Sequence, residues 1–222
     1  MLRKETGKAT VGQLRELLQQ RFPRWEPAVV AGLATGIPGI DGPLGGGLPR
    51  GAVSEVVEAR AGAGGQLMLT ALLGAVRKKH RFLALVDAMD GFDPQSTEPD
   101  LLRHLLWVRS GGVTPALRAA DLLARDNNMA ALVIDLRDAP DRELRRIQST
   151  VWFRFQRVVE TTEMALVVMT PHALVSSARI RLQLDHPLSL AALDHPRRDL
   201  LTILAPELNL RRQAAQPAEA AG

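Results

Sequence analysis

The sequence contains no cysteine, and this absence excludes several kinds of chemistry. Without thiols the chain has no disulfides, no thiolate metal ligands and no cysteine nucleophile, which suits the reducing cytoplasm. The five histidines show no ligand spacing of the HExxH kind. No apolar run approaches the roughly 20 residues of a membrane helix, and the charged start leads into no signal-peptide core. We therefore expect a soluble, cytoplasmic protein with no metal and no membrane segment.

The composition is that of a globular protein. With 222 residues and 46% hydrophobic residues, the chain is long enough for one sizeable α/β domain. The formal charge of +4 is modest, but arginine-rich patches leave two interpretations open. The patches either bind nucleic acid or an acidic protein, or they are part of an ordinary solvated surface.

The apolar pattern divides the chain into three parts. Apolar residues at helical spacing within residues 9–21, followed by "FPRWEP", predict a short N-terminal helix and a linker over residues 1–32. Residues 33–210 carry the apolar runs of a core domain. The Ala/Gln/Pro-rich end, residues 211–222, is typical of a disordered tail.

The core domain alternates between two patterns. Short apolar or alternating runs predict strands at 52–57, 82–88, 105–109, 130–136, 164–169 and 178–184. Amphipathic stretches between them predict helices, among them one with Thr114 as its N-cap and a long one over 138–160. A further strand is expected at "LLTIL" near the C-terminus. Such alternation predicts an α/β fold with a mostly parallel sheet and helices on both faces.

A glycine-rich turn between the first strand and its helix has the setting of a phosphate loop. Set against the pattern GxxxxGK[ST], the frame begins at Ala59 and contains glycines at Gly62 and Gly64, but Gly65 stands at the lysine position and Gln66 at the hydroxyl position. The turn thus lacks the ammonium that binds the β/γ-phosphates and the hydroxyl that binds magnesium. Nearby Arg60 could replace the charge, although it stands at the front of the loop. We expect a vestigial loop and no nucleotide cofactor.

The order of these motifs resembles the RecA-like recombinase superfamily. The lead-in "TGIPGIDGPLGGGLPRGAVSEVVEA", the stretch "LVDAMDGFDP" and the strand "ALVIDL" stand where that superfamily has its approach to the phosphate loop, its catalytic stretch and its Walker B strand. The resemblance implies a RecA-like fold over roughly residues 33–185. Met89 occupies the position of the glutamate that orients the attacking water, and a thioether cannot position that water. We therefore predict that the protein is not an enzyme.

Two further positions bear on the same resemblance. Asp135 ends the Walker B strand, where it could hold magnesium through water or could equally cap the neighbouring turn. The DNA-contacting loops of the recombinases are reduced to "RDAP" and to "TPHALVSS" at 170–177. A DNA filament built by this chain alone is therefore not expected, while weak electrostatic DNA binding stays open.

The combination of losses is similar to that of ImuA-type proteins, the RecA-like accessory proteins of bacterial damage-induced mutagenesis. That resemblance implies a non-catalytic adaptor in the DNA damage (SOS) response that contacts RecA and an ImuB-type, Y-family polymerase-like protein in error-prone translesion synthesis. The alternatives are a SulA-like inhibitor of cell division and a divergent RecA-like ATPase.

Two amphipathic segments are candidate partner-binding surfaces. An aromatic pair among arginines in the 138–160 segment suits a binding hot spot or a base-stacking platform, or it is simply buried. The N-terminal segment could dock on a RecA protomer or fold back on its own domain. The candidate residues are Leu14, Leu17, Trp25, Arg142, Arg145, Arg146, Trp152 and Phe153.

Overall fold

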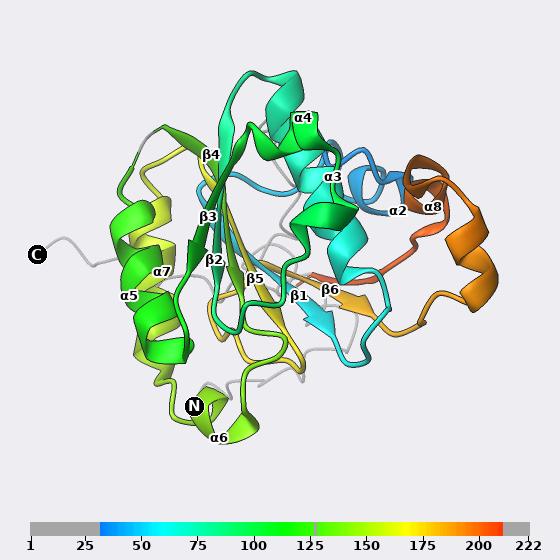
Figure 1. The fold of residues 1–222 in the computed structure, drawn as a ribbon. Coiled ribbons are helices and arrows are strands. Elements are labelled where there is room, and N and C mark those ends of the chain that lie inside the picture. Colours follow the sequence, from blue (N-terminus) through cyan, green and yellow to red (C-terminus); the bar gives the residue numbers. More distant parts are fainter. Residues whose placement is uncertain (1–31, 127, 211–222) are drawn as a thin grey trace, which may run out of the picture. The chain divides into compact units, whose positions relative to one another are not determined.

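A computed structural model of the chain describes residues 32–126 and 128–210, without the side chains of Leu190 and Leu193. The described residues form a seven-stranded sheet with helices against both faces (Figure 1). The predicted N-terminal helix, with the candidate residues Leu14, Leu17 and Trp25, lies outside the described residues, and so does the predicted tail at 211–222.

The elements follow one another as the alternating pattern predicts. The strands are β1 (Ala52–Glu58), β2 (Phe82–Asp87), β3 (Leu105–Arg109), β4 (Met129–Asp135), β5 (Ala165–Thr170), β6 (Ile180–Leu184) and β7 (Glu207–Leu210). The helices are α2 (Pro38–Asp41), α3 (Gly65–Lys78), α4 (Pro99–Leu102), α5 (Val113–Leu123), α6 (Asp141–Leu144), α7 (Ser149–Val159) and α8 (Arg197–Ile203), with 3-10 turns η1 (Pro94–Ser96) and η2 (Leu190–Asp194).

The sheet has the strand order β3-β2-β4-β5-β1-β6-β7. All neighbouring pairs from β3 to β6 are parallel, and only β7 runs antiparallel to its neighbour β6. Consequently the carboxyl ends of β1, β5 and β4 lie next to one another at one edge of the sheet. In open parallel sheets this edge is where ligands bind.

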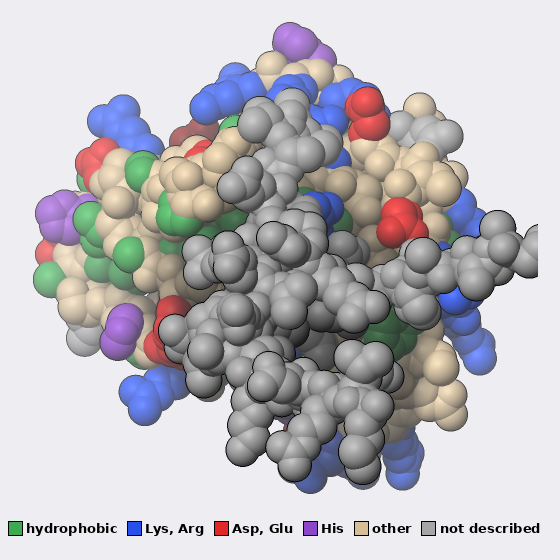
Figure 2. All heavy atoms as spheres, turned by 180° about the vertical axis from the view of Figure 1, so that it is seen from behind, with side chains coloured by type: hydrophobic (Ala, Val, Ile, Leu, Met, Phe, Trp, Pro, Cys, Tyr) green, Lys and Arg blue, Asp and Glu red, His purple; other side chains and the backbone are tan. Residues whose placement is uncertain are grey.

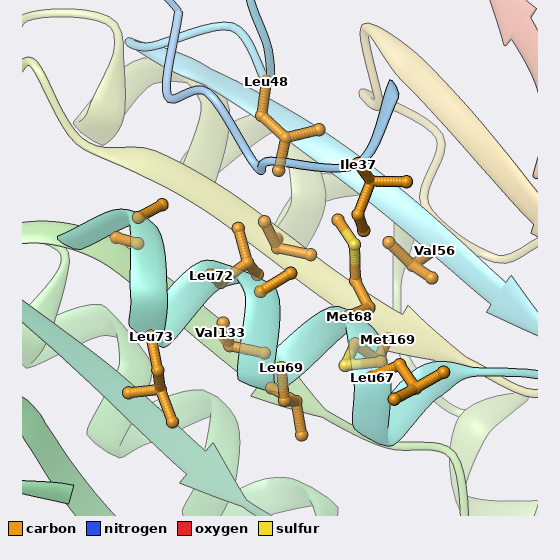
Figure 3. Packing of buried hydrophobic residues seen from close by; sticks show 14 of the residues in the cluster. Ile37, Leu48, Val56, Leu67, Met68, Leu69, Leu72, Leu73, Val133 and Met169 are labelled. Atoms are coloured by element: carbon orange, nitrogen blue, oxygen red, sulfur yellow. The ribbon is translucent and has the colours of Figure 1, made fainter. Parts of the chain in front are cut away.

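Two apolar layers hold the sheet between its helices. On one face, α3 packs its buried side chains, including Leu69 and Leu72, against the sheet residues Val56 and Val133 (Figure 3). On the other face, α5 and α7 cover the sheet (Figure 1), and the fully buried Phe155 of α7 belongs to this second layer. Because α3 follows the glycine-rich turn directly, its packing on the sheet fixes where that turn ends.

The predicted long helix over 138–160 is wrong in its continuity, because the structure has two helices there. Hydrogen bonds from Arg146 to Glu143 and from Ile147 to Leu144 tighten the chain after α6, and Gln148 is extended before α7 begins. Leu144 and Phe155 are nevertheless both fully buried in the same layer. The helical spacing of apolar residues continues through the turn between α6 and α7, so the sequence pattern could not reveal that the helix is interrupted there.

Two smaller predictions are also corrected. The "LLTIL" stretch is helical, since most of it lies in α8, which follows Pro196 at its N-cap and buries Leu200. The strand of this region comes after Pro206, as β7. Helix α5 begins one residue before the predicted cap, with Gly112 as its N-cap, so that Thr114 lies inside the helix.

Candidate functional site

The glycine-rich turn has the strand–turn–helix setting that the sequence predicts. It connects β1 to α3 at the carboxyl edge of the sheet. Gly62 and Gly64 have φ angles of 81° and 115°, in the left-handed region that side chains disfavour, and Gly64 is the N-cap of α3. The predicted order of strand, glycine turn and helix is thus confirmed, and Gly65 opens α3 directly after the turn.

The amide at the start of α3 is occupied by a carboxylate of the same chain. The N–H of Gly65 donates to Oε1 of Glu58 at 3.1 Å, and Glu58 is only 7% exposed. Amides at a helix N-terminus bind phosphate because they are unpaired donors at the positive end of the helix dipole. Here the last residue of β1 already provides the anion.

A guanidinium bridges this carboxylate to Asp135, the last residue of β4. Nη1 of Arg137 lies 2.6 Å from Oε2 of Glu58, and its Nε and Nη2 atoms donate to the two oxygens of Asp135 at 2.9 and 2.6 Å. Burial alone lowers the pKa of Arg137, but its hydrogen bonds and charge interactions with Asp135 and Glu58 outweigh burial and raise the pKa above its ordinary value. The guanidinium therefore remains charged at any physiological pH.

This cluster fills the space at the lysine position of the loop. A Cβ built on Gly65 would collide with both the Glu58 carboxylate and the Arg137 guanidinium. Next to it, both amide atoms of Gln66 are buried without a hydrogen-bond partner among the described residues. A side chain at position 65 would therefore have to displace the ends of the Glu58 and Arg137 side chains and disturb their ion pair.

The C-terminal segment packs on the outside of the same loop. The N–H of Leu188 donates to the Gly62 carbonyl at 3.0 Å. Leu204, which follows α8, lies so close to Gly64 that a Cβ there would stand 2.6 Å from its side chain. The loop is thus held from within by an ion-pair cluster and from outside by apolar packing.

The sequence indicates this loop, but it does not show which residues occupy it. Arg60, the proposed substitute for the lysine, is exposed and takes no part in the cluster. Asp135 serves both the ion pair and the turn, because its Oδ1 also accepts the Arg137 N–H at 3.1 Å. The sequence did contain signals of this ion pair, because the acidic Glu58 stands directly before the loop and Arg137 stands two positions after Asp135.

The loop after β2, which contains Met89, is built around a buried carboxylate. Asp87 accepts hydrogen bonds from the N–H groups of Met89, Gly91 and Phe92 and from the Trp107 indole, and it is 1% exposed. Met89 itself is 39% exposed and places no polar group near the phosphate loop. Asp90 pairs with Arg109, and this hydrogen bond lowers the pKa of the Asp90 carboxyl.

The loop after β5 is anchored in the same manner. Oε1 of Glu55, a fully buried residue of β1, accepts the N–H groups of Leu174 and Val175 and the Thr170 hydroxyl, at 2.6 to 3.1 Å. Its other oxygen pairs with Arg181 at 2.6 Å. The 171–177 segment, which the sequence resemblance aligns with a DNA loop of the recombinases, is therefore a short turn fixed to the sheet.

The partner-binding candidates on α6, in the turn after it and on α7 separate into two groups. Arg142, Arg145, Arg146 and Phe153 are exposed, Phe153 to 53%, whereas Trp152 is 1% exposed and belongs to the core. The pair Trp152 and Phe153 is thus not a joint surface feature. On the face drawn in Figure 2, Lys and Arg side chains stand at several separate places along the outline.

Two features are absent from the described part of the chain. Residues 32–126 and 128–210 contain no group of three or more His, Asp or Glu side chains that could hold a metal ion. None of the helices described there is long and apolar enough to cross a membrane.

The parallel sheet, its strand order and the glycine turn after β1 define an α/β protein with a RecA-like fold. Among solved structures, the chain is similar to the crystal structure of the RadB recombinase, with a TM-score of 0.54 and 17% sequence identity over 68% of this chain and 83% of that chain. No protein-family model matches the sequence, and no curated protein matches it either. At this identity the similarity establishes the fold.

Proposed function

We propose that this protein is a non-catalytic, RecA-like accessory protein of the bacterial DNA damage response. In this role it binds RecA, a Y-family polymerase-like protein of the ImuB type, or both, and supports error-prone translesion synthesis in the cytoplasm. The observation that carries the proposal is the buried ion pair at the glycine-rich turn, where Glu58 accepts the Gly65 N–H and pairs with Arg137.

Three features support the absence of ATP turnover. The ammonium and the magnesium-binding hydroxyl of the loop are missing, and the loop is filled by an ion pair. The Walker B aspartate is engaged by Arg137. At the position of the catalytic glutamate, Met89 offers no group that could orient water. A divergent ATPase would have to break the Arg137 pairs before it could bind magnesium at Asp135.

The short loops support a role away from DNA catalysis. Glu55 fixes the turn after β5, and helix α6 begins soon after β4. Neither segment offers the long loop that the recombinases use to contact single-stranded DNA. The exposed arginines and Phe153 on α6 and α7 instead suit a protein interface, because aromatic and arginine side chains dominate binding hot spots.

A pull-down with RecA filaments on single-stranded DNA tests this proposal. We expect the purified protein to bind the filaments, to change RecA's ATP turnover in a dose-dependent manner and to show no turnover of its own. Turnover by this protein that is lost in Asp135→Ala would support the divergent ATPase instead. Filamentous cells on overexpression, without RecA binding, would support the SulA-like alternative.

A further inference from the structure

We propose that Glu58 is a resident anion of the phosphate loop, and that removal of its carboxylate opens a binding site for phosphate-class anions. The proposal rests on the proposed function in one respect, since it assumes that the natural loop binds no nucleotide. It goes further by assigning the exclusion to one side chain. In this view the hydrogen-bond donors of the site, the Gly65 N–H and the Arg137 guanidinium, are still present, and the Glu58 carboxylate of the same chain occupies them as an intramolecular competitor.

Both contacts of Glu58 are of the kind that a phosphate makes. Its Oε1 accepts the Gly65 N–H at 3.1 Å, at the start of the 14-residue helix α3. Its Oε2 accepts from Nη1 of Arg137 at 2.6 Å. A helix start and a guanidinium are both preferred phosphate ligands, the first through unpaired amides and the second through its planar array of donors.

The charge of the cluster explains why a free anion would be excluded. Glu58 and Asp135 contribute two negative charges and Arg137 one positive charge, so that the buried cluster has a net charge of −1. The start of α3 offsets only about half a charge of this. Without Glu58 the remaining pair is neutral, and the helix start makes the site positive.

The competitor is also held in place. Glu58 is the last residue of β1 and is 7% exposed, so its carboxylate cannot leave the loop without breaking two hydrogen bonds in a buried site. A tethered group acts at a high effective concentration, of the order of millimolar or more, against a dilute ligand. The loop therefore keeps its shape without any ligand.

The test is isothermal titration calorimetry of the full-length protein with pyrophosphate, comparing the natural protein with Glu58→Ala. We expect Glu58→Ala to bind pyrophosphate at least roughly tenfold more tightly, because a competing anion and a repelling charge are both removed. The matched control is Glu163→Ala, which removes the same charge from a side chain that is 83% exposed and pairs with Arg50. The control should bind no better than the natural protein.

Two further variants make the result decisive. Glu58→Gln keeps the size of the side chain while removing its charge, and it replaces Glu58→Ala should that variant not fold. The gain should disappear in Glu58→Ala combined with Arg137→Gln, because the guanidinium is then missing. The proposal is overturned if the natural protein binds pyrophosphate as tightly as the variant. It is also overturned if a folded Glu58 variant shows no gain in affinity for pyrophosphate. Neither result depends on RecA binding, which tests the proposed function separately.

Discussion

Arg137 and Glu58 are 79 positions apart in the sequence, yet Nη1 of one lies 2.6 Å from Oε2 of the other. The contact links the end of β1 to the residues just after β4, across the intervening strand β5. In a nucleotide-binding protein of this fold, these two strand ends would hold the phosphates and the magnesium ion. Here a salt bridge joins them directly, and several predictions depend on it.

The first prediction concerns the stability that Arg137 contributes. Arg137→Gln leaves two buried carboxylates without their cation, and loss of one partner of a buried pair costs about 3–5 kcal/mol. Urea denaturation should therefore show a strongly reduced free energy of unfolding. Arg125→Gln is the control, since its ion pair with Asp121 is 3.4 Å long and exposed, and such pairs contribute less than about 1 kcal/mol. Equal losses in the two variants would contradict the structural role of Arg137.

The second prediction concerns two glycines of α3 and uses one substitution at both. Gly65→Ala places a Cβ against Glu58 and Arg137, so we expect a loss of about 1–3 kcal/mol from overpacking. Gly74 lies inside the same helix, and apart from its chain neighbours and the backbone of that helix, no atom lies within 4 Å of the place that an added methyl group would take. Gly74→Ala should therefore stabilise the protein by about 0.5–1 kcal/mol.

Opposite signs in thermal unfolding of these two variants are the expected result. A stabilising Gly65→Ala would mean that the loop is open at the lysine position. For the same steric reason, Gly65→Lys should not restore ATP turnover, and measurable turnover in Gly65→Lys would contradict the occupied loop.

The sequence was sufficient for the fold because local patterns and global topology agree. Short apolar strands such as β4 and amphipathic helices such as α3 are recognisable one at a time, and parallel pairing follows from their alternation. The pattern was insufficient where apolar spacing continued through a turn, as between α6 and α7. It also misjudged "LLTIL", because a short apolar run suits either a strand or a helix.

The sequence could predict which residues of the phosphate-loop motif are missing, but not which residues lie at the site instead. Missing residues such as the lysine are visible at fixed positions of a motif. The Glu58–Arg137 pair is visible only in three dimensions, because its members belong to different motifs. Likewise, the neighbours Trp152 and Phe153 look equivalent in the sequence, while helix geometry buries the first and exposes the second.

The third prediction concerns the turn after β5. Glu55→Ala removes the acceptor of the Leu174 and Val175 amides and the carboxylate that pairs with Arg181. We expect the free energy of unfolding to fall by about 3–5 kcal/mol, and the 171–177 segment to become a site of rapid cleavage in limited proteolysis. Glu55→Gln, which keeps an acceptor of the same size, should be affected less. Unchanged cleavage in a folded Glu55→Ala would show that Glu55 does not hold the turn.

The fourth prediction separates stability from partner binding on α7. Trp152→Ala removes a fully buried indole and should cost about 3–5 kcal/mol of stability. Phe153→Ala truncates a ring that is 53% exposed, so thermal unfolding should change little. If α7 contacts a partner, however, Phe153→Ala should weaken the RecA or polymerase-like complex in a pull-down, since exposed aromatics act as hot spots. Leu122→Ala on α5, where the side chain is 73% exposed, is the matched control. Normal binding by Phe153→Ala, with unchanged stability, would move the interface away from this helix.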